Sequence, residues 1–102
     1  MPFRTKKDYE KAVLLVRAEI NKWDPYCLIE TGSPDDEFDG EVNSIVKQIP
    51  RIKSKLDTAH AISRTFSSSF EAEYFTVDSC LEVGEKIFTV LESEGLVDAA
   101  HT

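Results

Sequence analysis

The sequence is poor in the residues that build disulfide bonds and metal sites, with only two cysteines and two histidines among 102 residues. Cys27 and Cys80 are far apart in the sequence, and neither His60 nor His101 lies close to them. The sequence therefore lacks the closely spaced pairs of ligands that bind a metal ion from a short loop or from one face of a helix. Nothing in the spacing favours a disulfide. We expect both thiols to be reduced in a cytoplasmic protein and predict no metal and no cofactor.

Long apolar runs are also missing. The uncharged apolar stretch at residues 12–16 is far too short to span a membrane, which takes about 20 apolar residues. The basic N-terminal residues are followed by Asp8, Glu10 and Lys11 instead of the apolar run of a signal peptide. The net charge of −7, from 19 acidic and 12 basic residues, disfavours nucleic acid and anionic membranes as direct partners. A charged partner is therefore expected to be basic.

Signals of β-structure are absent as well, because no stretch alternates with period two and no Asn-Gly or Asp-Gly joins two strand-like runs. Apolar residues recur instead at helical spacing in four stretches. The length fits one domain, residues 1–102, with a core at about 5–95 and a frayed tail at 97–102. We predict an all-α fold: a compact bundle of four main helices plus one short helical turn.

Capping residues set the predicted helix bounds. The first helix covers residues 6–23 and the second residues 39–49, before Pro50. Ser54 with Asp57 starts the third helix, Thr76 starts the fourth, and Gly95 ends it. Arg17, Glu10 and Asn21 are expected on the outer face of the first helix. The predicted inward faces are Tyr9, Ala12, Val13, Leu15, Val16, Ile20 and Trp23; Val42, Ile45, Val46 and Ile49; Leu56, Ala59, Ile62, Phe66 and Phe70; and Val77, Cys80, Leu81, Gly84, Ile87, Phe88 and Leu91.

The segment between the first two helices is unusual. Residues 24–46 contain seven acidic residues and no lysine or arginine. Asp24-Pro25 predicts a short helical turn that Gly32 ends, and a further turn is expected at 33–37. Ser33-Pro34 and Asp39-Gly40 offer competing caps, and propensity does not decide between them. Trp23 just before this segment either completes the core stripe, which its spacing favours, or anchors a partner.

The acidic residues do not complete a calcium loop. With Gly40 at position six, the first, third, fifth, seventh and ninth positions are Asp35, Glu37, Asp39, Glu41 and Asn43. Position twelve, which must bring a bidentate carboxylate, is the apolar Val46.

Nucleophilic catalysis has no better support. Cys27 and His60 could act as a nucleophile and its base, but no Gly-rich oxyanion or phosphate loop accompanies them. Cys80 is expected in the core and His60 on the surface beside the third helix stripe. We predict that the protein is not an enzyme.

Several short motifs resemble those of a family of small bacterial helical proteins of unknown function. The likeness covers residues 8–92 and rests on Trp23-Asp24-Pro25-Tyr26 with Leu28, on Pro34-Asp35-Asp36-Glu37-Phe38-Asp39 with Glu41, on Ile49-Pro50-Arg51, on Phe66 and Phe70, and on Phe75-Thr76, Cys80-Leu81-Glu82-Val83 and Lys86-Ile87. Cys27 stands where the family motif Trp-Asp-Pro-x-Gly-Leu has glycine. The resemblance implies a compact all-α fold, and relatives of this type are similar to immunity proteins that accompany bacterial toxins, including those of contact-dependent growth inhibition.

The resemblance and the charge together lead to a hypothesis of function. We expect an immunity protein that binds and neutralises a cognate toxin domain, such as a basic nuclease, whose positive cleft an acidic surface would match. The alternatives are a regulatory or housekeeping interaction module with another partner, and a solvated loop whose acids only cap helices. The oligomeric state stays open. The expected partner-binding residues are Glu30, Asp35, Asp36, Glu37, Asp39 and Glu41.

Overall fold

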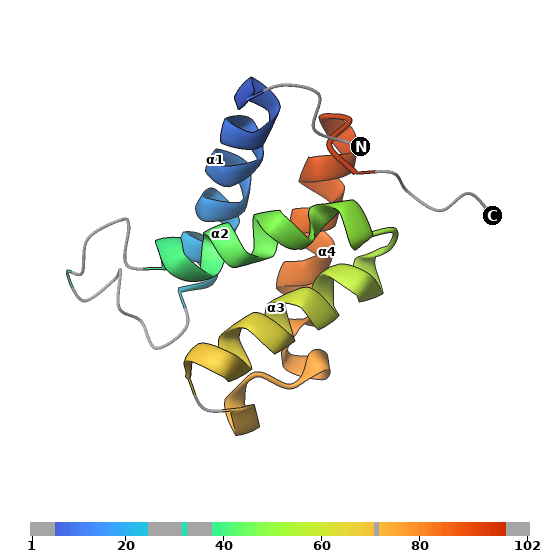
Figure 1. The fold of residues 1–102 in the computed structure, drawn as a ribbon. Helices are drawn as coiled ribbons and strands as arrows, with labels where there is room; N and C mark the ends of the chain where they lie inside the picture. Colours follow the sequence, from blue (N-terminus) through green and yellow to red (C-terminus); the bar gives the residue numbers. More distant parts are fainter. Residues whose placement is uncertain (1–5, 25–31, 33–37, 71, 98–102) are drawn as a thin grey trace.

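The computed structural model of the protein describes residues 6–24, 32, 38–70 and 72–97. This part of the chain contains helices and no strand, and the predicted all-α bundle of four main helices is confirmed (Figure 1). The elements are α1 (Lys6–Trp23), α2 (Asp39–Gln48), the 3-10 turn η2 (Ile49–Arg51), α3 (Lys55–Ser69), the 3-10 turn η3 (Ala72–Tyr74) and α4 (Val77–Ser93). The turns expected at 25–31 and 33–37 lie outside the described residues.

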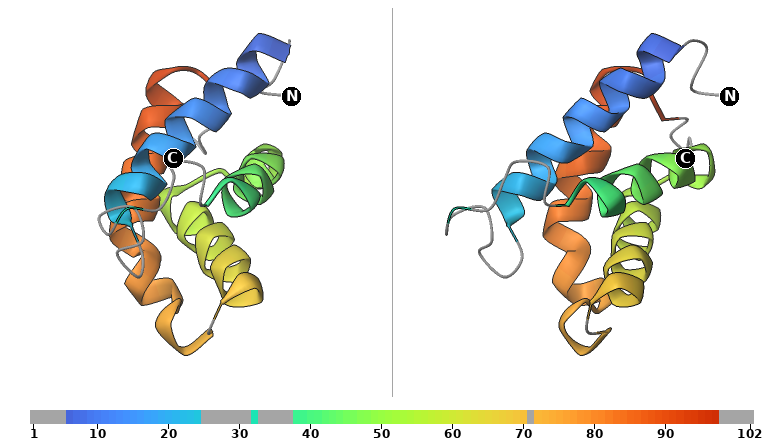
Figure 2. Two further views of the ribbon diagram at one scale, coloured as in Figure 1. Left: turned by 90° about the vertical axis from the view of Figure 1, so that its left-hand side faces the viewer. Right: turned by 60° about the vertical axis from the view of Figure 1, so that its left-hand side comes forward.

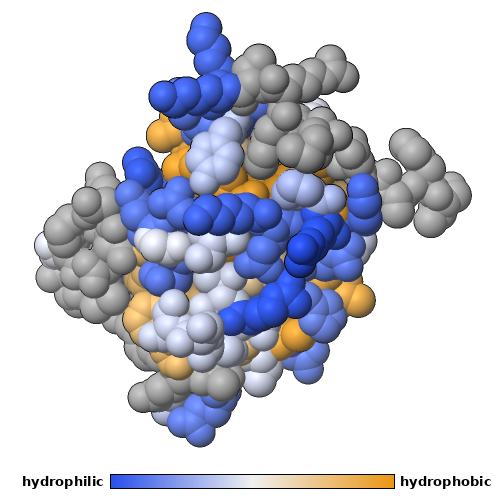
Figure 3. Space-filling model, in the orientation of Figure 1, coloured by the Kyte–Doolittle hydropathy of each residue, from blue (hydrophilic) through white to orange (hydrophobic). Residues whose placement is uncertain are grey.

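The four helices surround one apolar core. α3 and α4 form an antiparallel hairpin with the most extensive packing, and α1 lies beside α4 and runs in the opposite direction (Figure 2). α2 packs against both α1 and α3. Polar side chains cover much of the face that α2 and α3 present (Figure 3).

Side-chain caps start the last two helices, as the sequence predicts. The Ser54 hydroxyl accepts a hydrogen bond from the backbone N–H of Asp57 at 3.1 Å, and the Asp57 carboxylate accepts one from the N–H of Lys53 at 2.9 Å. At α4, the Thr76 hydroxyl accepts from the N–H of Ser79 at 3.2 Å. The bonds to the Ser54 and Thr76 hydroxyls each satisfy a first-turn N–H that has no partner within its helix.

Gly95 ends α4 in the left-handed region, with φ of +71°. The N–H of Leu96 donates to the carbonyl of Leu91 at 2.9 Å. This is the hydrogen bond of the Schellman motif, which commonly ends a helix at glycine. Leu96 and Val97 then fold back and are buried. Val97, which we expected at the start of a frayed tail, therefore belongs to the core, and residues 98–102 lie outside the described part.

The inward face predicted for the second helix is confirmed. Val42, Ile45, Val46 and Ile49 are fully buried, although α2 ends at Gln48 and Ile49 opens the 3-10 turn.

Two residues of the predicted core stripes lie at the surface instead. Leu56 is 52% exposed at the edge of the α3 stripe, and Leu81 is 42% exposed at the edge of the α4 stripe. On α3 the buried face extends to Thr58, Ala61 and Thr65. The predictions for Leu56 and Leu81 were therefore wrong.

The closest approach between α3 and α4 depends on Gly84. A Cβ atom at this position would lie 2.9 Å from the backbone nitrogen of Ala59 and 3.0 Å from its Cα. Backbone atoms cannot move aside as a flexible side chain can, so the hairpin packs at this distance only with glycine at position 84.

We therefore expect Gly84→Ala to lower the free energy of unfolding by about 1–3 kcal/mol, the usual cost of overpacking a core. Urea unfolding followed by circular dichroism measures it. Gly40→Ala is the matched control, because a Cβ atom there meets nothing within 4 Å and position 40 lies in helix α2. The control should be neutral or stabilising, by up to about 1 kcal/mol. Equal losses in the two variants would contradict the proposed close approach.

Candidate binding surface around Trp23

An aromatic cluster joins the ends of all four helices. It consists of Trp23, Phe38, Phe66, Phe70 and Phe75, which come from the end of α1, the start of α2, the end of α3 and the entry to α4. The Phe66 ring lies at its centre, with centroids 5.3 Å from Trp23 and 5.2 Å from Phe75. Phe38 lies 6.0 Å from Phe66. These separations are typical of favourable aromatic pairs.

The cluster fixes both flanks of the acidic segment at residues 25–37. On one side Asp24 adopts a left-handed conformation, with φ of +47°, while its N–H donates to the carbonyl of Ile20 at 2.8 Å. On the other side Phe38 is 1% exposed. The segment therefore leaves the described bundle beside Trp23 and re-enters it at Phe38, within a single aromatic cluster.

The structure describes two of the six expected partner-binding residues. Glu30, Asp35, Asp36 and Glu37 lie outside the described residues, whereas Asp39 and Glu41 stand in the first turn of α2. Nothing in the structure tests whether a partner contacts them, so their role stays a prediction.

Asp39 has a contact within the protein. Its two carboxylate oxygens accept hydrogen bonds from Nε and Nη2 of Arg17 at 2.9 and 2.8 Å. Arg17 was expected on the outer face of α1, but its side chain turns toward α2 and is only 34% exposed. The paired fork geometry ties α1 to α2, so Asp39 contributes to the fold as well as to the surface charge.

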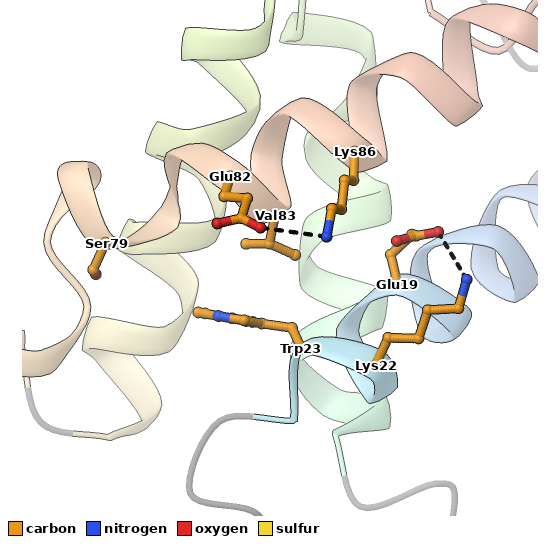
Figure 4. A pocket seen from close by; sticks show the side chains of 7 residues that line it. All are labelled: Glu19, Lys22, Trp23, Ser79, Glu82, Val83 and Lys86. Atoms are coloured by element: carbon orange, nitrogen blue, oxygen red, sulfur yellow. Dashed lines mark ion pairs between the residues drawn. The ribbon is translucent and has the colours of Figure 1, made fainter.

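Trp23 is partly buried and packs against the core, as its spacing predicts, although it is not among the fully buried residues. One side of the indole contacts Phe66 and Phe75, and the ring also lines a cleft of about 290 Å³ between α1 and α4 (Figure 4). The other residues that line this cleft are Glu19, Lys22, Ser79, Glu82, Val83 and Lys86. We call this surface the Trp23 cleft.

Charged side chains form the rim of the Trp23 cleft. Lys22 pairs with Glu19 at 3.6 Å along α1, and Lys86 pairs with Glu82 at 3.5 Å along α4. The side chains of Lys22, Glu82 and Lys86 are 74%, 87% and 61% exposed. Exposed pairs of this kind contribute at most about 1 kcal/mol, so a binding partner can replace them at little cost.

The cleft continues along the same two helices. A second, more open hollow adds Glu85, Thr89 and Val90 and shares Glu19, Lys22 and Lys86 with the Trp23 cleft. An open groove that combines a partly buried tryptophan with a rim of both charges is typical of a surface that binds a protein or peptide.

The residues considered for metal binding are not grouped in the described part of the chain. In residues 6–24, 32, 38–70 and 72–97, no three histidine, cysteine, aspartate or glutamate side chains lie together as metal ligands. Val46, at position twelve of the calcium loop considered above, is fully buried in the core. It therefore belongs to the core stripe, as the sequence predicts.

Of the two candidates for nucleophilic chemistry, Cys27 and His60, the structure describes only His60, which does not line the Trp23 cleft. His60 is exposed on α3, and Cys27 lies outside the described residues. Cys80 is fully buried, as expected, and burial raises the pKa of its thiol, although a contact with the Ser79 hydroxyl acts in the opposite direction. A buried thiol with a raised pKa is a poor nucleophile at neutral pH.

A family model described as a domain of unknown function (DUF1871) matches residues 15–95, and the chain belongs to this family. No curated protein matches the chain, and no solved structure does either. The matched range includes both flanks of the acidic segment and every residue that lines the Trp23 cleft. In the described part of the chain, no helix is long and apolar enough to cross a membrane.

Sequence reasoning considered Trp23 but missed the rest of the cleft. Ser79, Glu82 and Lys86 are ordinary polar positions on α4, and only the packing of α4 against α1 brings them to Trp23. The feature of the sequence that indicates this cleft is the position of the single tryptophan directly before the acidic segment.

We expect Trp23→Ala to lower the free energy of unfolding by about 2 kcal/mol, less than a fully buried aromatic residue because the indole is half-buried. Trp23→Phe should cost less, since a ring still meets Phe66 and Phe75. Chemical unfolding followed by circular dichroism measures both. In the native protein, acrylamide should quench the single tryptophan at an intermediate rate. Complete protection from acrylamide would show that Trp23 does not line an open cleft.

Cys80 should resist thiol reagents while the protein is folded. A Cys27→Ala variant leaves Cys80 as the single thiol, so reaction with Ellman's reagent reports on Cys80 alone. We expect reaction only as fast as global unfolding exposes the thiol, and prompt reaction in denaturant. Prompt reaction of the native variant at neutral pH would contradict the burial.

Proposed function

We propose that this protein is a small non-catalytic binding protein, an immunity protein that binds and neutralises a cognate toxin domain. The observation that carries the proposal is that both flanks of the acidic segment are held by the aromatic cluster, because Trp23 and Phe38 both contact Phe66. Flanking residues that are fixed before binding lose little conformational freedom when a partner covers them.

Charge supports a basic partner. Residues 24–46 carry seven acidic residues without a lysine or arginine, in a protein with a net charge of −7. A nuclease presents a positive cleft for phosphate groups, and an acidic surface competes for that cleft. Such complementarity mainly raises the association rate and rejects wrong partners.

Trp23 supplies the apolar part of the proposed interface. Tryptophan is among the residues that most often dominate binding energy, and here Phe66 and Phe75 already hold the ring. A ring that is fixed before binding costs little side-chain entropy when a partner covers it. The acidic segment would then steer the partner, while Trp23 and the rim of its cleft would slow its release.

The test is to search for a toxin-like domain encoded beside this protein and to measure binding to it. We expect a tight complex that protects cells from that domain. Replacing Asp35, Asp36 and Glu37 by their amides should slow association about tenfold at low salt and flatten its salt dependence. Asp39 is kept, because its removal would also break the pair with Arg17.

The matched control changes three exposed carboxylates at the other end of α1 and α4, in the variant Glu10→Gln, Glu92→Gln and Glu94→Gln. Glu94 pairs with Lys11 at the surface, and the loss of such an exposed pair costs at most about 1 kcal/mol. It removes the same charge, so a general effect of net charge would slow association equally in both variants. If only the control slows association, the acidic segment is not the interface. If no neighbouring toxin domain binds and none is neutralised, the protein is an interaction module of another kind.

A further inference from the structure

Basic side chains gather in one part of this acidic protein. Between residues 42 and 70 the chain contains five lysines and arginines and a single acidic residue, Asp57. The two arginines of this stretch, Arg51 and Arg64, line a pocket of about 220 Å³ between the end of α2 and α3. The pocket is also lined by Gln48, Ile52, Asp57, His60 and Ala61.

Arg64 is held in place by a neutral group. The side-chain carbonyl of Gln48 accepts hydrogen bonds from Nη2 of Arg64 at 2.7 Å and from Nε at 3.3 Å. The Gln48 amide nitrogen in turn donates to the hydroxyl of Thr65 at 2.9 Å and to the carbonyl of Ser44 at 3.1 Å. Thr65 is 7% exposed, so the hydrogen bonds through which Gln48 positions Arg64 are connected to a buried residue.

This arrangement orients the guanidinium without cancelling its charge. An arginine side chain has five N–H donors, and Gln48 uses two of them, so three are left for a ligand. Within the described residues, neither Arg51 nor Arg64 has a carboxylate within ion-pair distance, whereas Arg17 has Asp39. A pre-oriented arginine that keeps its full charge is suited to bind a phosphate group.

Asp57 is the one opposing charge in the pocket. Its Oδ2 atom already accepts the N–H of Lys53 at 2.9 Å, which commits the carboxylate to the start of α3. Because two arginines, Arg51 and Arg64, face one carboxylate, the net charge of the pocket is positive. The volume suits a small ligand, because drug-sized sites begin at about 300 Å³.

We propose that the pocket between Gln48, Arg51 and Arg64 binds the phosphate group of a small molecule, with Gln48 as a positioning residue for Arg64. The site does not depend on the proposed toxin partner, because it lies on α2 and α3, away from the residues that line the Trp23 cleft between α1 and α4.

The test is titration of the ¹⁵N-labelled full chain with inorganic phosphate and with adenosine monophosphate at constant ionic strength, followed by amide chemical shifts. We expect saturable shifts at Arg51, His60 and Arg64. Tighter binding of the nucleotide would identify a phosphate ester as the ligand, whereas equal affinities would identify the free anion. Absence of saturation with both probes would overturn the proposal.

Three variants complete the test. Arg64→Gln and Arg51→Gln should each weaken phosphate binding about tenfold or more, as expected for the loss of a charge-assisted hydrogen bond. Gln48→Leu keeps both arginines but releases Arg64, so it should weaken binding by a smaller factor. Lys7→Gln, an exposed lysine in the first turn of α1, is the matched control and should bind as the original protein does. If Lys7→Gln loses as much affinity as Arg64→Gln, binding reflects overall charge and the pocket is not a site.

Discussion

The contact of Phe66 with Trp23, Phe38 and Phe75 is the constraint on which the rest of the structure depends. It brings together the end of α1, the start of α2 and the entry to α4 around one ring near the end of α3. Hydroxyl groups of Ser63 and Ser67 donate to the carbonyl of Phe75, so the backbone at this junction is held together with the ring. The fixed flanks of the acidic segment, Trp23 and Phe38, and the partly buried position of Trp23 both follow from this contact.

Local patterns predicted most of the fold. The apolar spacing gave the inward face of α2, while Ser54, Thr76 and Gly95 marked helix ends that the structure confirms. Periodicity finds the centre of a buried stripe, but its width depends on the neighbouring helix. Leu56 and Leu81 lie at the edges of their stripes and were wrongly placed in the core for that reason. The spacing of apolar residues does not indicate the 3-10 turns η2 and η3.

The sites could not be predicted to the same extent, because their residues meet only through packing. Lys22 and Lys86 are 64 positions apart and reach one cleft because α1 and α4 run side by side in opposite directions. Arg64 reaches Gln48 across the contact of α2 with α3. The net charge of −7 also hid the positive stretch at residues 42–70, since a sum over the chain cannot show that opposite charges are segregated.

This segregation follows the helix dipole of α2. Asp39 and Glu41 stand in its first turn and Lys47 in its last turn, and a helix favours acids at its N-terminus and bases at its C-terminus. The charges therefore stabilise α2 while giving its two ends opposite potentials. Ten residues of α-helix span about 15 Å, which exceeds the Debye length of about 8 Å at physiological salt. A basic partner at the Asp39 end and a phosphate group at the Gln48 end would therefore interact only weakly, and α2 can carry both sites at once.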